Sequence, residues 1–168
     1  MLLISMLVLL AQTSTPTIKP SQHGTVSQTI ASTTLTVDYN RPVARGRDLF
    51  GALVPYDRVW CPGADNCTTL EVSTDIKIEG KDLPAGKYSL WAIPGADKWT
   101  IIINSAQPIF HTQYKTIESK DVLRLDVTPR VGTHMETLAF YFPVVNARHT
   151  ELAFHWGTVV VPLAIDVP

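Results

Sequence analysis

Hydrophobic and polar residues alternate along most of the chain from Thr25 onward, with short breaks between the alternating segments. Leu35, Val37 and Tyr39 alternate with threonine and aspartate, and the segment Val159–Val167 repeats the pattern near the end of the chain. A period of two places successive side chains on opposite faces of a β-strand. No segment keeps a helical period of about 3.6 residues over three turns. The pattern therefore predicts an all-β fold.

The alternating segments predict about nine or ten short strands, separated by turn signals at roughly ten-residue spacing. We expect strands at Thr25–Ile30, Thr33–Tyr39, Thr69–Ser73, Ile76–Ile78, Lys87–Ile93, Trp99–Asn104, Val122–Thr128, Glu136–Phe142, Thr150–Trp156 and Thr158–Val167. Many short strands with regular turns favour a single-domain antiparallel β-sandwich, and an up-and-down barrel is the alternative.

Three features qualify this strand pattern. Gly157 separates the last two segments and indicates a tight turn or a bulge. Pro162 has no backbone N–H to donate, so it favours an edge position for the last strand. Residues 105–121 show no period and are expected to form a surface loop.

The first eleven residues, MLLISMLVLLA, are almost entirely apolar. This stretch is shorter than the roughly 20 apolar residues of a membrane span, but it has the length of the hydrophobic part of a signal peptide. It lacks a preceding basic residue, and a buried N-terminal strand or helix is the alternative. Residues 12–23 are rich in Pro, Ser and Thr and are expected to form a flexible linker before a β-sandwich domain at 24–168. We therefore expect an exported protein, periplasmic or secreted, without an integral membrane span in its mature form.

Composition and charge exclude several classes of function. A chain of 168 residues can form one domain with a sizeable core. Its net charge is −1 at pH 7, so no overall positive field attracts nucleic acid, and no nucleic-acid partner is expected. The sequence contains no nucleophile elbow, P-loop or dinucleotide-binding fingerprint, and we expect no cofactor.

The segment Tyr56–Thr69 interrupts the strands and holds both cysteines of the chain. The spacing of Cys61 and Cys67 is not the CxxC of thiol oxidoreductases, and no partner ligands stand at zinc-site spacing. In an exported protein the simplest interpretation is a structural disulfide that holds Asp65 and Asn66 in place. Two free, buried cysteines are the alternative.

From about Ser21 onward the chain resembles the family called domain of unknown function 2911. The resemblance rests on an ordered series of motifs: TVSQTI (25–30), VDYNRP (37–42), FGALVPY (50–56), VW (59–60), GKDLPAGKYSL (80–90), IP (93–94) and WTIIIN (99–104). It implies an exported β-sandwich domain and no established activity. After the Val-Trp step the family usually has WRTGANEAT, whereas this chain has WCPGADNCT. Cys61, Asp65, Asn66 and Cys67 are thus departures from the family pattern, and a function served by the usual Arg and Glu would be lost or altered here.

Arginine side chains before and within the cysteine segment could bind a ligand. Arg41, Arg45, Arg47 and Arg58 could line a pocket for an acidic ligand, because guanidinium groups bind carboxylates in a bidentate manner. Four aspartates, at positions 38, 48, 57 and 65, are near in sequence. Internal ion pairing is therefore the favoured interpretation of these arginines.

The histidines and aromatic residues give weaker signals. The five histidines lack HExxH or HxH spacing, and no metal site is expected. A metal site would require the fold to bring distant residues together, for example His23 and Asp65. His155 is predicted on the outer face of a strand, facing away from Trp156. Aromatic rings near the cysteines are best explained by core packing, although the face of Trp91 suggests partial exposure and stacking rings could bind a glycan.

These observations favour an exported β-sandwich binding or interaction module for a glycan or peptide. Its candidate ligand-binding residues are Arg41, Arg47, Trp60, Asp65 and Asn66. One alternative is a hydrolase-type enzyme in which Asp65 forms an acid–base pair with a second carboxylate or with His23. The other alternative is a purely structural envelope domain. No catalytic residue is assigned.

Overall fold

The structure, a computed structural model, describes residues 18–168. The apolar segment 1–11 and the linker residues 12–17 lie outside the described residues. The elements are β1 (Gln22–Ile30), β2 (Thr33–Arg41), β3 (Thr69–Val72), β4 (Ile76–Ile78), β5 (Lys81–Leu83), β6 (Gly86–Ile93), β7 (Trp99–Asn104), the 3-10 turns η1 (Tyr114–Thr116) and η2 (Glu118–Lys120), β8 (Asp121–Val127), β9 (Arg130–Val145) and β10 (His149–Asp166).

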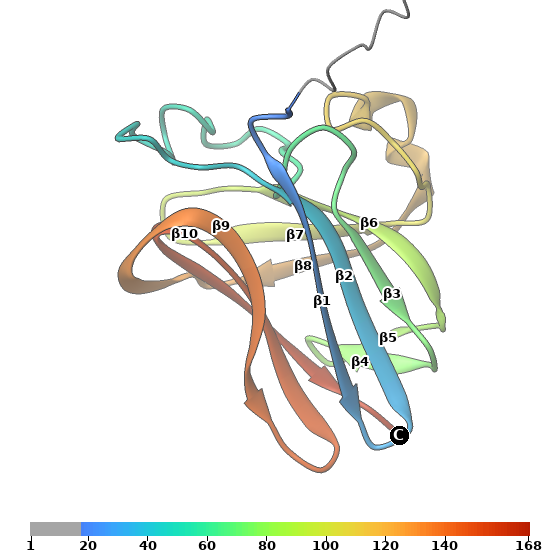
Figure 1. Ribbon diagram of the computed structural model, residues 1–168. Coiled ribbons are helices and arrows are strands. Elements are labelled where there is room, and N and C mark those ends of the chain that lie inside the picture. The colour runs from blue at the N-terminus through green and yellow to red at the C-terminus, as the bar shows by residue number, and fades with distance from the viewer. Residues whose placement is uncertain (1–17) are drawn as a thin grey trace, which may run out of the picture.

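The strands form two antiparallel sheets, so the predicted sandwich is confirmed and the barrel alternative is wrong (Figure 1). One sheet has the order β1-β2-β3-β6-β7-β8, and the other has the order β5-β4-β10-β9. The main core lies between them: Leu35, Val37 and Leu90 come from the first sheet, and Phe154 and Leu163 come from the second. The buried positions on β2 recur at every second residue, as the sequence pattern predicts.

The last predicted pair of strands is a single strand, β10, bent sharply at Gly157. Gly157 has a φ of +58°, and the pairing with β9 changes register on both sides of it, which identifies a β-bulge. The bend brings the end of the strand back to its beginning. The backbone N–H of Val167 donates to the carbonyl of Arg148 at 2.9 Å, and His149 Nδ1 lies 2.8 Å from the carboxylate of Asp166.

Pro162 does not mark an edge strand, because β10 lies between β4 and β9 in its sheet. Pairing with β9 ends at Val160, and pairing with β4 begins at Ile165. Pro162 therefore lies between the two ladders, where a missing backbone N–H breaks no ladder hydrogen bond.

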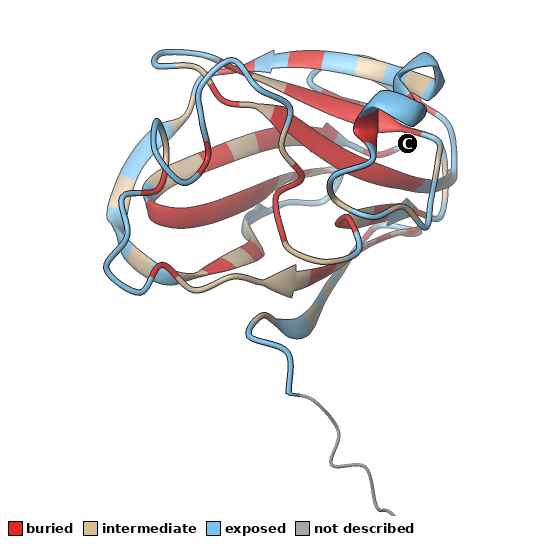
Figure 2. Ribbon diagram, turned by 90° about the horizontal axis from the view of Figure 1, so that it is seen from above, coloured by how far each residue is buried: buried red, intermediate tan, exposed pale blue. Residues whose placement is uncertain are grey.

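A second, smaller apolar cluster covers the outer face of the six-stranded sheet. Residues 105–120 fold over this face and bury Tyr114 and Ile117 against Trp91 and the two cysteines. Trp91 is only 1% exposed, so the prediction of partial exposure is wrong. The predicted surface loop is instead a cover with an apolar underside. Figure 2 views the molecule from above and shows buried segments on the strands together with exposed connections.

His155 faces away from Trp156 as predicted, but it is not at the surface. The bent ribbon of β9 and β10 places Gly132 directly over the imidazole, so that a Cβ on Gly132 would lie 3.0 Å from His155 Cε1. The side chain is 5% exposed, and its Nε2 has no hydrogen-bond partner. A strand pattern identifies the two faces but not the bend that covers one of them.

Candidate functional site

One end of the sandwich carries the long connections, in the upper part of Figure 1. We call residues 42–55 the arginine loop and residues 61–67 the cysteine loop. A cavity of about 390 Å³, the arginine pocket, lies between these loops and the residues that precede β1. Its wall is formed by Pro20, Ser21, Pro42, Val43, Arg45, Arg47, Leu53, Val54, Trp60, Gly63, Ala64, His111 and Trp156. The pocket therefore combines two guanidinium groups with a mostly apolar wall.

The cysteine loop is closed by the predicted disulfide between Cys61 and Cys67, whose Cα atoms are 5.7 Å apart. Hydrogen bonds fix the loop to its surroundings. Asn40 Nδ2 donates to the carbonyl of Ala64 at 3.0 Å, and the hydroxyl of Thr68 donates to the carbonyl of Pro62 at 2.6 Å. Gly63 packs so closely on Thr68 that a Cβ would lie 2.7 Å from its Oγ1. The cysteine loop is thus a firmly held wall of the pocket.

The arginine loop turns tightly at Arg45 and Gly46, both of which have positive φ values, +53° and +68°. Arg47 closes this turn, because its Nε donates to the carbonyl of Ala44 at 2.8 Å and its Nη2 to that of Val43 at 2.6 Å. The backbone N–H of Ala44 donates to the carbonyl of Glu136 on β9 at 2.8 Å. These bonds attach the loop to the second sheet.

The predicted internal ion pairing of the arginines is wrong. Within residues 18–168, Arg41, Arg45, Arg47 and Arg58 form no ion pair with a carboxylate. Arg41 Nε donates to the carbonyl of Leu138 at 3.1 Å, and Arg45 Nη2 approaches the carbonyl of Pro20 at 3.4 Å. Neutral carbonyl oxygens accept these bonds, so neither guanidinium group is tied up by a side-chain ion pair with a carboxylate.

The candidate residues do not all meet at the pocket. Arg47 and Trp60 line it, whereas Arg41, Asp65 and Asn66 are not among its lining residues. The carboxylate of Asp65 lies 3.3 Å from Lys19 Nζ, and the carbonyl of Asp65 accepts the backbone N–H of His111 at 2.9 Å. Asn66 is exposed and bridges to Phe110 through the backbone.

His23, one of the two partners proposed for Asp65 in a hydrolase-type site, lies beside another aspartate instead. His23 Nε2 lies 3.4 Å from the carboxylate of Asp38 and forms its ion pair there. Across residues 18–168, no group of three or more His, Cys, Asp or Glu side chains is arranged to hold a metal ion.

A second cavity of about 730 Å³ adjoins the arginine pocket, and Arg47 and Trp156 line both. Its other side is formed by the bend of β10 and by His134, whose Nε2 lies 3.0 Å from Glu136 Oε2. The hydrogen bond from His134, the backbone N–H of Arg45 at 2.6 Å and the charge of Arg47 hold the pKa of Glu136 below its usual range. Glu136 is therefore an anchored carboxylate beside this cavity.

Sequence reasoning missed the second cavity. The predicted strand began at Glu136, so His134 was placed outside it, although the two residues stand two positions apart on β9 and share a face. Trp156 was predicted only as the last residue of an alternating strand. The alternation of the sequence continues before Glu136 and could have extended the predicted strand to His134. No pattern within either segment, however, indicates that β9 packs against the arginine loop.

The rings at the pocket belong mainly to the core. Trp60 and Trp156 stack with ring centroids 6.1 Å apart and planes inclined by 14°, and Phe50 packs against both edge-on. Trp60 also meets Trp99 in an edge arrangement. This cluster agrees with the core-packing interpretation of the aromatic residues, and it gives the pocket a rigid floor.

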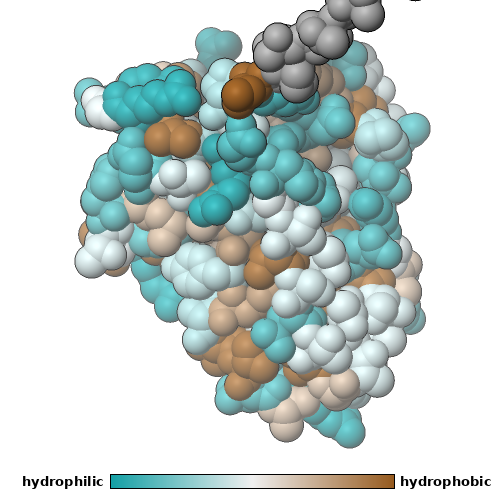
Figure 3. Space-filling view, viewed as in Figure 1, coloured by the Kyte–Doolittle hydropathy of each residue, from teal (hydrophilic) through white to brown (hydrophobic). Residues whose placement is uncertain are grey.

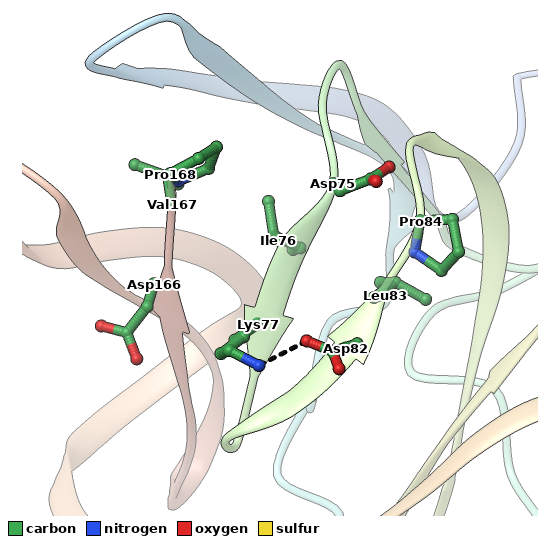
Figure 4. A pocket seen from close by; sticks show the side chains of 9 residues that line it. All are labelled: Asp75, Ile76, Lys77, Asp82, Leu83, Pro84, Asp166, Val167 and Pro168. Carbon is green, nitrogen blue, oxygen red and sulfur yellow. Dashed lines mark hydrogen bonds and ion pairs between the residues drawn. The ribbon is translucent and has the colours of Figure 1, made fainter.

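A smaller cavity of about 310 Å³ lies at the opposite end of the sandwich (Figure 4). Ile76, Leu83 and Val167 form its apolar floor. Among the rim charges, Lys77 pairs with Asp82, and Asp166 pairs with His149. Because most of its charges are already paired, this cavity is a weaker candidate for charge recognition than the arginine pocket.

Comparisons with known proteins identify a family but no function. A family model described as "Protein of unknown function (DUF2911)" matches residues 21–165. No curated protein and no solved structure matches the chain. Among residues 18–168, no helix is long and apolar enough to cross a membrane.

Proposed function

The chain belongs to the DUF2911 family of proteins of unknown function, and we propose that it is a binding module whose arginine pocket takes a carboxylate-bearing ligand, a glycan or a peptide. One observation carries this proposal: Arg45 and Arg47 line a walled pocket, and neither is ion-paired with a carboxylate in the described chain. A guanidinium group presents several N–H donors in a planar fork that matches a carboxylate.

The surroundings of the two arginines support an anion as the ligand. Two backbone carbonyls hold the guanidinium group of Arg47, whereas that of Arg45 makes one longer contact of 3.4 Å, and both keep other N–H groups for a ligand. Strongly hydrophilic side chains gather at this end of the molecule, whereas the lower part of the same view mixes hydrophobic and weakly polar residues (Figure 3). The apolar wall around Leu53 and Val54 would contact the uncharged part of the ligand.

We include export in this proposal. A disulfide is compatible with an oxidising compartment such as the periplasm or the extracellular space, where such bonds persist. Sequencing the N-terminus of the natural protein tests the export step. A mature protein that still begins at Met1 would contradict removal of a signal peptide.

Titration of the folded protein with matched acidic and neutral ligands tests the binding function. The probes are trigalacturonic acid and N-acetylglutamate amide, with maltotriose and N-acetylglutamine amide as their neutral counterparts, followed by NMR chemical shifts or calorimetry. We expect the acidic probes alone to bind. Binding should weaken as ionic strength rises, because salt screens exposed charges.

Arg45→Gln is the decisive variant, since Arg45 makes only one long contact to the protein by its side chain. Loss of a charge-assisted hydrogen bond costs about 1.5–3 kcal/mol, so we expect affinity to fall roughly tenfold or more. Arg58→Gln is the matched control, because Arg58 is exposed and is not among the lining residues of the pocket. No binding of any acidic probe, or equal losses in the two variants, would overturn the proposal.

A further inference from the structure

We infer that the ligand is an extended peptide segment that carries an acidic side chain and spans both cavities at this end of the sandwich, an inference that rests on the proposed function. Arg47 and Trp156 line the arginine pocket and the second cavity alike. The two cavities are therefore neighbouring compartments on either side of the arginine loop. A ligand that is held at Arg47 has access to both.

The two cavities differ in charge. The arginine pocket presents Arg45 and Arg47. The second cavity shares Arg47 with it and adds Asp48 and His134, and His134 is held by the carboxylate of Glu136. An acidic group is thus favoured beside Arg45 and Arg47, and an amine or other hydrogen-bond donor is favoured beside Asp48 in the second cavity. A ligand with both groups a few bonds apart fits this order better than a single small anion.

The lining favours a peptide over a glycan. Trp60 and Trp156 stack on each other and receive the edge of Phe50, so these rings have little free face for a sugar ring. Aliphatic side chains, among them Val43 and Leu53, form the remaining apolar wall of the first cavity. In the second cavity the exposed ring of Tyr56 offers a face on which a sugar could stack, so trigalacturonic acid is the competing probe.

The probes are capped heptapeptides of alanine and glycine with glutamate at the centre and one lysine placed in turn at each other position. The reference ligand is N-acetylglutamate amide, which can fill only the first cavity. We expect the best heptapeptide to bind at least tenfold more tightly than this reference. Replacing its glutamate by glutamine should remove most of the affinity.

Variants that fill the second cavity separate the two claims. Thr158→Trp and Ala52→Trp each place a large ring there at an exposed position outside the first cavity. We expect both to abolish the advantage of the heptapeptide and to leave the affinity for N-acetylglutamate amide unchanged. Thr128→Trp, at an exposed position that lines neither cavity, is the control and should change neither affinity. Unfolding curves of all three variants verify that they fold.

The outcomes distinguish the inference from the function beneath it. If N-acetylglutamate amide binds through Arg45 but no heptapeptide binds more tightly, the extended-peptide inference is overturned while the acidic pocket stands. The same holds if trigalacturonic acid binds more tightly than every heptapeptide. If no acidic probe binds at all, the proposed function is overturned and the inference is overturned with it.

Discussion

Removing the disulfide should lower the free energy of unfolding by about 2 kcal/mol through the entropy of the unfolded chain. The bond joins residues separated by six positions, so it closes a short loop. On the chain-entropy model, a short loop contributes less than a long one, because fewer conformations of the unfolded chain are removed. In the variant Cys61→Ala/Cys67→Ala the loss should exceed this value, because both side chains are buried in the outer apolar cluster.

The folded structure itself should survive this change. Backbone bonds hold the cysteine loop independently of the disulfide: Cys67 N–H donates to the carbonyl of Ile109 at 2.8 Å, and His111 N–H to that of Asp65 at 2.9 Å. Side chains of Asn40 and Thr68 add two further bonds to the loop backbone. We therefore expect a native circular dichroism spectrum and an unchanged dependence of unfolding on urea, with only the midpoint lowered.

Urea unfolding of the oxidised protein, the reduced protein and the double alanine variant measures the effect. For a domain of about this size, 2 kcal/mol corresponds to a melting temperature lower by roughly 4 to 8 °C. Reduced protein isolates the contribution of the covalent link, and the alanine variant adds the loss of packing. If oxidised and reduced protein unfold within about 0.5 kcal/mol of each other, the loop-closure argument is refuted.

Three further changes test other parts of the structure. Gly157→Ala should destabilise the fold by more than the roughly 1–2 kcal/mol that a left-handed backbone costs, because the added Cβ would lie 2.9 Å from Leu49. Gly80 also has a positive φ but has open space around it, so Gly80→Ala should lose only that backbone cost. Urea unfolding of the two variants measures the difference. The pKa of Glu136 is lowered in the folded state, so stability should fall as pH drops below about 4.3, the unfolded value, through the lower folded pKa. Stability measured against pH should lose this component in Glu136→Gln, and an identical profile would contradict the assignment. Burial and a hydrogen bond to a carboxylate raise the pKa of Tyr114, so stability should decline above about pH 10, where the unfolded tyrosine loses its proton first, and Tyr114→Phe should reduce that decline in alkaline unfolding curves.

Local patterns were sufficient for most of the strands. The hairpin of β1 and β2 turns at Ala31, as the break in alternation predicts, and Lys87–Ile93 pairs with Trp99–Asn104 as expected. The two cysteines, taken with the expected export, were sufficient to suggest their disulfide. These features depend on residues close in the chain, so their geometry is limited by backbone sterics and short loops.

The candidate site was only partly predictable, because it is assembled from distant segments. Arg47 and Trp60 were identified beforehand, but Arg45 was expected to find a nearby aspartate. In the structure its backbone bonds to Glu136, which is 91 positions away. Nearness in sequence does not bring an arginine and an aspartate together when the loop between them directs their side chains apart.

The sequence by itself determined the alternation that makes this chain a sandwich and the cysteine pair that closes its loop. Only the tertiary structure decided that the bend at Gly157 buries His155, that residues 105–120 cover Trp91, and that Arg45 and Arg47 line a pocket without a side-chain ion pair. The physical reason is the range of the interactions. A period of two distinguishes the faces of a strand, whereas burial and charge pairing depend on which remote segment packs against each face.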